Sequence, residues 1–180
     1  MATRGPKVSD LKRYLSQCSE TQLANEIVDL FKKIPAVQDY YQVKLDPQAA
    51  DAVAEKYKTT IRREFATEYR PGPGRLSVAR KAVMDFKKVA GSVDSVADMM
   101  LFYVEQGVAY TEAFGDIDEP FYNSMESMYQ TAAQWTTKHG LRPVFLPRFQ
   151  RLVSATAHMG WGFHDTLSDM YQEFFSAFEG

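Results

Sequence analysis

Two stretches of the 180-residue sequence combine residue types that could carry out chemistry. The first, here called the acidic elbow, consists of Glu112, Asp116, Asp118, Glu119 and Glu126. Glu112 lies seven residues after Glu105 and Glu126 lies seven after Glu119, so each pair would share one face of a helix. Carboxylates that project from facing helices are the usual ligands of metal sites in helical bundles. The elbow is therefore a candidate site for a divalent metal.

The second stretch is His158-Met159-Gly160-Trp161-Gly162-Phe163-His164-Asp165, with Asp169 one helical turn later. A histidine near carboxylates can act as a general base or as a metal ligand. The glycines on either side of Trp161 would allow a tight turn or close backbone packing. The candidate functional residues of this stretch are His158, Trp161, His164, Asp165 and Asp169.

Each candidate also has a structural interpretation, which the sequence favours. Asp118 is a natural N-cap, and Glu119 and Pro120 suit the first turn of a helix. The elbow lacks the Glu-x-x-His pairs of di-iron bundles, and its spacing does not fit a calcium-binding loop. His164 would then hydrogen-bond a buried helix end. No catalytic residue and no cofactor beyond a divalent metal is assigned.

The charge of the chain is unevenly distributed. Residues 1–91 carry 17 Lys and Arg against 11 Asp and Glu, whereas residues 92–180 carry 4 against 12. The basic half resembles a phosphate-binding surface, but acids are interspersed in it and the pI is near 5.9. The pattern argues against nucleic acid as a partner. It fits two halves with complementary fields, or an acidic face for a cation or a basic partner.

Composition narrows the class of protein. Hydrophobic residues make up 45% and charged residues 24%, which is typical of a globular chain. No apolar run is long enough for a transmembrane helix, and the N-terminus lacks the apolar segment of a secretory signal. Cys18 is the only cysteine, which excludes an internal disulfide. We expect a soluble, cytoplasmic protein without a membrane partner.

Helical periodicity runs through the chain, with no convincing strand pattern. The organising segment is 93–114, whose apolar residues cover more than one stripe and predict packing on two sides. Further helices are predicted over about 10–17, from Ser19 to Ile34, over 35–45, after Asp46-Pro47 to about Phe65, and over 77–90. Three more follow, from Asp118 to Gly140, over 143–156 and over 163–178.

These elements predict an all-α fold, an irregular multi-helix bundle of about nine helices. The alternative is a short stack of antiparallel helical hairpins. Residues 1–180 are expected to form one helical domain. The loop near 68–75, which contains Pro71-Gly72-Pro73-Gly74, is not taken as a domain boundary.

Several segments carry a resemblance to a known family. They include Tyr40-Tyr41-Gln42-Val43-Lys44-Leu45, Leu101-Phe102-Tyr103-Val104-Glu105-Gln106-Gly107, Gly115-Asp116-Ile117-Asp118-Glu119-Pro120-Phe121-Tyr122 and Gly160-Trp161-Gly162-Phe163-His164-Asp165. With them the chain resembles a family of small bacterial all-helical proteins known only as a domain of unknown function. The resemblance implies a bacterial, cytoplasmic, stand-alone protein. It supplies no activity, cofactor or catalytic residue.

Two functional hypotheses remain. The leading one is a non-enzymatic helical module for protein interaction or regulation, with a protein partner or self-association. The alternative is a metal-binding protein or metal-dependent enzyme that uses the acidic elbow and the turn at 160–165. The two differ in whether these segments converge in one open pocket or serve as helix caps.

Overall fold

The computed structural model describes residues 5–67 and 70–176. Within them the chain forms nine α-helices, one short 3-10 turn and two short strands, which confirms the predicted all-α multi-helix bundle. The helices are α1 (Val8–Leu15), α2 (Glu20–Lys33), α3 (Pro35–Leu45), α4 (Ala50–Phe65), α5 (Leu76–Val89), α6 (Val93–Phe114), α7 (Glu119–Lys138), α8 (Arg142–Ala155) and α9 (Phe163–Phe175); the others are η1 (Pro47–Ala49), β1 (Ala66–Thr67) and β2 (Arg70–Pro71).

Local capping signals explain why the helices begin where the sequence predicts. Ser19 accepts a hydrogen bond from the backbone of Gln22, and the Gln22 side chain returns one to the Ser19 backbone. This reciprocal pair is the predicted capping box, and it satisfies two amide groups that no helical carbonyl can reach. Ser92 starts α6 and Asp118 starts α7 in the same way, each accepting from an amide three residues later. These signals depend only on neighbouring residues.

The helix α6 is the centre of the bundle. It contributes ten buried residues and packs against α4 and α5 on one side and against α7 and α8 on the other. Gly107 permits the closest of these contacts, because a Cβ there would lie 2.1 Å from the sulfur of Met125 on α7. The predicted packing of α6 on two sides is therefore confirmed.

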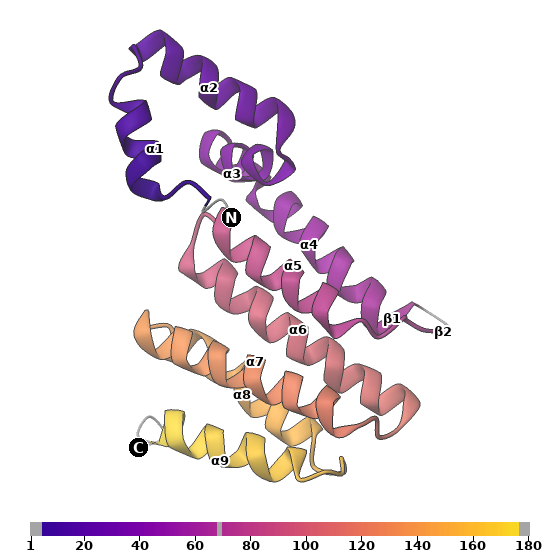
Figure 1. Ribbon diagram of the computed structural model, residues 1–180. Coiled ribbons are helices and arrows are strands. Elements are labelled where there is room, and N and C mark those ends of the chain that lie inside the picture. The colour runs from indigo at the N-terminus through magenta and orange to yellow at the C-terminus, as the bar shows by residue number, and fades with distance from the viewer. Residues whose placement is uncertain (1–4, 68–69, 177–180) are drawn as a thin grey trace.

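The helices follow one another in space largely in chain order (Figure 1). The N-terminal helices α1–α3 lie at one end of the molecule and α9 lies at the other, with α4–α8 between them. The pairs α4 with α5 and α6 with α7 make the most extensive contacts between consecutive helices. The arrangement therefore also has the hairpin character of the alternative fold prediction.

Four local predictions need correction. The loop after α4 is not wholly irregular, because β1 and β2 pair antiparallel, with Ala66 opposite Pro71. Asp46 caps the 3-10 turn η1, and α4 begins only at Ala50. α1 runs two residues earlier than expected. The last helix ends at Phe175, and Phe178 lies outside the described residues.

A further difference concerns the role of α2. Its stripe of Ile27, Leu30, Phe31 and Ile34 has the spacing of a core-facing surface, yet these side chains keep 41–44% of their area exposed. Among the described residues, neither α1 nor α2 has a single buried one. The pattern is typical of a buried helix, but the rest of the described chain covers it only in part.

Candidate functional site

The acidic elbow connects α6 to α7, and most of its acids are exposed. Glu112, Asp116 and Glu119 all lie on the surface. Asp118 Oδ1 accepts a hydrogen bond of 2.9 Å from the backbone N–H of Phe121, so it is the N-cap of α7. The favourable interaction of an acid with the positive end of the helix dipole accounts for Glu119 in the first turn.

Asp116 joins the elbow to the turn at 160–165. Its Oδ1 accepts hydrogen bonds from the Tyr122 hydroxyl at 2.5 Å and from the Gly160 backbone N–H at 3.1 Å. A Cβ at Gly160 would lie 2.7 Å from Asp116 Oδ2, so the close approach needs a glycine. The Tyr122 hydroxyl, followed by the Gly160 amide, holds the pKa of Asp116 below its usual value. The two predicted segments therefore meet, through one carboxylate.

His164 caps a helix end. Its Nδ1 lies 3.1 Å from Oγ1 of Thr156, the C-cap of α8, and 3.2 Å from the backbone oxygen of Val153 in the last turn of α8. The backbone oxygen of Val153 also accepts hydrogen bonds from the backbone N–H and the hydroxyl of Thr156, so His164 adds a contact at an end where Thr156 already serves. A hydrogen bond at a helix end is the structural role that the sequence suggested for His164, and the helix is α8.

The other candidates lie apart from this contact or on the surface. His158, Asp165 and Asp169 are exposed. Trp161 is 62% exposed and has a φ of +60°, which is uncommon for a residue with a side chain. Glu126 is half-buried, and this burial raises its pKa, an effect opposed by a hydrogen bond with Thr166 on α9.

These positions do not assemble a metal site. Within residues 5–67 and 70–176, no three His, Cys, Asp or Glu side chains are grouped so that they could hold a metal ion. The elbow and the turn contact each other, but Asp118 and His164 serve as helix caps, and Asp116 ties the two segments together. The geometry therefore favours the structural interpretation of the cluster.

Sequence reasoning missed a more substantial charge cluster on the central helices. Arg148 on α8 forms hydrogen bonds with Glu105 through two nitrogens, both at 2.8 Å, and with Asp98 Oδ1 at 2.6 Å. Lys58 on α4 reaches Asp98 Oδ2 at 2.6 Å. Burial raises the pKa of Asp98, but Lys58 and Arg148 outweigh it, and the net shift is downward. The seven-residue spacing of Asp98 and Glu105 places both on one face of a helix, and this spacing could have indicated the cluster.

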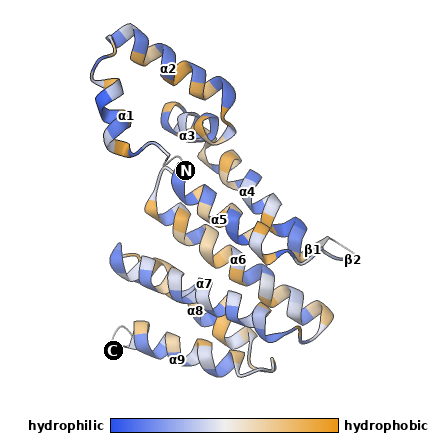
Figure 2. Ribbon diagram, viewed as in Figure 1, coloured by the Kyte–Doolittle hydropathy of each residue, from blue (hydrophilic) through white to orange (hydrophobic). Residues whose placement is uncertain are grey.

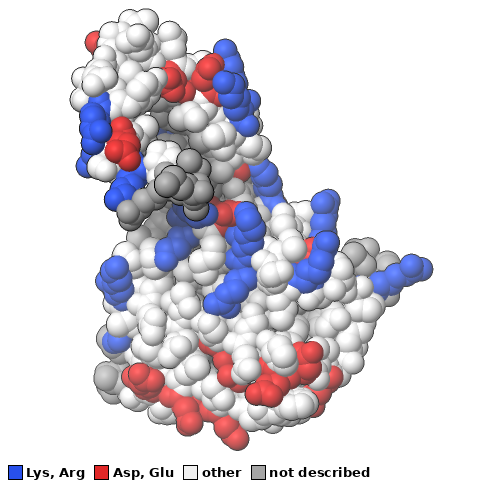
Figure 3. Space-filling model, in the orientation of Figure 1, with Lys and Arg blue, Asp and Glu red and all other residues white. Residues whose placement is uncertain are grey.

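Several basic residues of the basic half are paired with acids of the same half. Lys56 bridges Asp39 at 2.8 Å, Arg62 bridges Glu55 at 2.8 Å, and Arg75 bridges Glu64 at 2.7 Å. Lys81 and Lys88 both pair with Asp85. Figure 3 shows basic side chains over the upper and middle part of this face and acidic ones gathered at its lower end. The pairs named above lie within the basic half itself, whereas Lys58 and Asp98 join the two halves.

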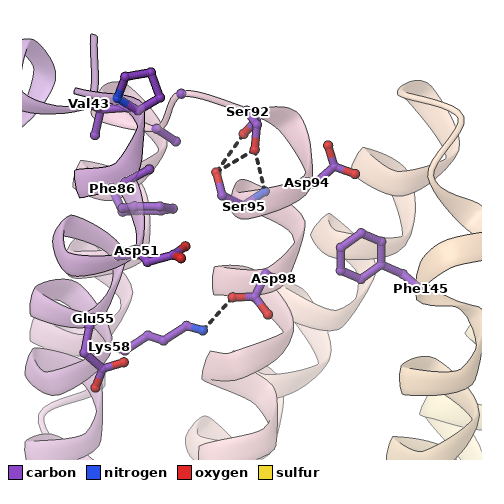
Figure 4. A pocket seen from close by; sticks show the side chains of 15 residues that line it. Val43, Asp51, Glu55, Lys58, Phe86, Ser92, Asp94, Ser95, Asp98 and Phe145 are labelled. Carbon is purple, nitrogen blue, oxygen red and sulfur yellow. Dashed lines mark hydrogen bonds and ion pairs between the residues drawn. The ribbon is translucent and has the colours of Figure 1, made fainter. Parts of the chain in front are cut away.

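A hollow of about 700 Å³ opens between α4 and α6 (Figure 4). Val43, Phe86 and Phe145 give it apolar walls. Its acids include Asp51 on α4 and Asp98 on α6, and Lys58 crosses it to pair with Asp98. It lies close to the Arg148 cluster and away from the elbow, so the predicted residues do not line it.

Ten large apolar side chains of residues 5–45 form a third feature, here called the apolar N-terminal surface. Ile27 and Phe31 on α2 and Leu11 on α1 are typical members, with 41–52% of their area exposed. The full set is Val8, Leu11, Tyr14, Ile27, Val28, Leu30, Phe31, Ile34, Tyr40 and Leu45. Elsewhere in the described chain only Val93, Phe114, Val144 and Trp161 are comparably exposed. Apolar exposure is thus concentrated at one end.

Comparison with known protein families gives a match over most of the chain. A family model described as a family of unknown function, DUF6155, matches residues 7–175. The chain belongs to this family. The predicted resemblance to a family of unknown function is confirmed. No curated protein and no solved structure matches the chain.

Membership of DUF6155 assigns no activity to the chain. In residues 5–67 and 70–176, no helix combines the length and apolar character needed to cross a bilayer.

Proposed function

We propose that this protein is a non-enzymatic helical interaction module, and that the apolar N-terminal surface is where it binds a protein partner. The observation that carries the proposal is that α1 and α2 have the stripes of core-facing helices but bury no residue in the described chain. Figure 2 shows apolar segments along α2 and at the lower end of α1. Large apolar side chains exposed together at one end of a protein are typical of interaction sites.

The shape of the surface supports helical recognition. A hollow of about 370 Å³ between α2 and α3 is lined by Phe31, Tyr41 and Leu45 among others. A second one, about 440 Å³, lies along α1 beside Val8, Leu11 and Tyr14. Hollows of this kind accept apolar side chains spaced along one face of a partner's helix. The partner is therefore a protein that presents apolar side chains from helices.

The lengths of α1 and α2 give a reason for such a partner. They contain 8 and 14 residues, and isolated helices shorter than about 12–15 residues are marginal in water. Such helices gain most of their stability from burial of the apolar face. Within the described chain that burial is incomplete, so a partner would stabilise them.

The proposal includes a cytoplasmic location and a single domain spanning the chain. Cys18 is the only cysteine, which fits a reducing compartment. The succession of packed helices from α2 to α9 fits one domain.

A pair of truncations tests whether the surface is free for a partner. In dilute protein, Ile27→Ala should cost less than about 1 kcal/mol of unfolding free energy, as expected for a partly exposed side chain. The matched control is Leu101→Ala at the centre of α6, which is fully buried and should cost about 2–5 kcal/mol. Urea unfolding followed by tryptophan fluorescence measures both. Equal losses would mean that Ile27 belongs to the core of the chain itself, and the proposal would fail.

A further inference from the structure

We infer that the partner of the apolar N-terminal surface is a second copy of this chain, so that the α1–α3 regions of two copies bury one another about a two-fold axis. The inference rests on the proposed interaction function and names its partner.

The size of the surface fits a dimer interface. Its ten side chains keep between 41% and 76% of their area exposed. Together they expose on the order of 1,000 Å², and a standard specific interface buries about 800 Å² on each partner. The surface is therefore large enough for a stable pair without help from another region.

The charges around the surface also allow it to meet a copy of itself. Residues 5–45 carry 6 Lys and Arg against 5 Asp and Glu. A nearly neutral, mixed surface does not repel its own copy, whereas a surface with one dominant sign does. Residues 92–180 illustrate the second case, with 4 basic residues against 12 acidic ones. Self-association is thus electrostatically easier through α1–α3 than through the C-terminal half.

The stability of α1 and α2, which depends on burial of their apolar faces, also favours a second copy as the partner. Because these short helices need cover, the covering surface must be present whenever the chain folds. A second copy meets this condition by itself. A two-fold arrangement uses the same patch on both copies, so the complex closes at two and leaves no apolar surface to propagate.

The mass of the full-length protein in solution tests the inference. We expect sedimentation or light scattering to give twice the 20.5 kDa mass of one chain. Single substitutions Ile27→Glu and Phe31→Glu on α2 should each weaken the dimer at least tenfold. Leu11→Lys on α1 provides an independent variant with the opposite charge. The matched control is Val144→Glu, because Val144 on α8 is 67% exposed and lies outside the surface.

Hydrogen exchange locates the interface even if a variant loses helical structure. In the wild-type protein, amides of α1 and α2 should exchange more slowly as concentration rises, because burial suppresses local opening. Amides of α6 should show no such dependence, because α6 is already covered within one chain.

The outcomes separate the inference from the proposed function. A wild-type mass of one chain up to about 100 μM overturns the second-copy inference, because interfaces of this area bind with micromolar or tighter affinity. It leaves the interaction function standing if Ile27→Ala still costs little. A dimer that Val144→Glu disrupts and Ile27→Glu does not would also overturn the inference, since its interface would lie elsewhere.

Discussion

Asp116 Oδ1 accepts a hydrogen bond from the backbone N–H of Gly160 at 3.1 Å, across 44 residues of sequence. The same oxygen accepts from the Tyr122 hydroxyl. One carboxylate therefore fixes the connection before α7 against the turn before α9. Its role is structural, and it gives the acidic elbow a measurable pH dependence.

Tyr122→Phe should destabilise the protein by about 1 kcal/mol at neutral pH, because it removes one hydrogen bond to a charged acceptor. The pKa of Asp116 is lowered in the folded protein, first by Tyr122. Its stabilising contribution is therefore present above the unfolded Asp pKa of about 3.9 and is lost as the pH falls below it. Urea unfolding at pH 7 and pH 3 measures the effect. An equal cost at both pH values would show that the ionised carboxylate is not what Tyr122 stabilises.

Arg148→Ala should lower the free energy of unfolding by about 3 kcal/mol, because it removes the cation that Asp98 and Glu105 share. The Arg148 side chain is only 18% exposed. Arg151→Ala on the same helix is the control, because Arg151 is exposed and its removal should change stability by less than about 0.5 kcal/mol. Thermal unfolding compares the two. Similar midpoints for both variants would contradict a structural role for the cluster.

His164→Ala should lower stability by about 1–2 kcal/mol, because the end of α8 loses a hydrogen-bonding partner near the fully buried Thr156. His158→Ala should have little effect, since His158 is exposed. Chemical denaturation of both variants provides the measurement. If addition of a divalent ion raised the midpoint of the wild type and not of His164→Ala, a ligand role would have to replace the capping role.

Gly107→Ala should destabilise the protein by about 1–3 kcal/mol, although alanine normally favours a helix over glycine. The added methyl group would overlap the Met125 sulfur and push α6 and α7 apart. Shortening the partner in Gly107→Ala/Met125→Val should recover part of the loss. A double variant that is simply the sum of two independent losses would count against direct packing between these positions.

The sequence alone determined the helices and several of their ends, because these depend on residues within one or two turns. The Ser19 capping box, the Asp118 N-cap and the apolar spacing of α6 are complete signals in themselves. Because these signals are local, the sequence was also sufficient to predict the all-α fold class and the role of Asp118 as a helix cap in the elbow. The pairing of β1 with β2 was missed because two-residue strands leave no periodic pattern.

Only the tertiary structure decided which side chains meet and which stripes stay uncovered. The contacts of Asp116 with Gly160 and of Arg148 with Asp98 span 44 and 50 residues, and no local rule specifies a partner at that distance. The stripe of α2 has the spacing of a core helix, yet Ile27 and Phe31 remain 44% and 41% exposed. Periodicity identifies an apolar face, but the packing of the rest of the chain determines whether that face is buried internally or left for a partner.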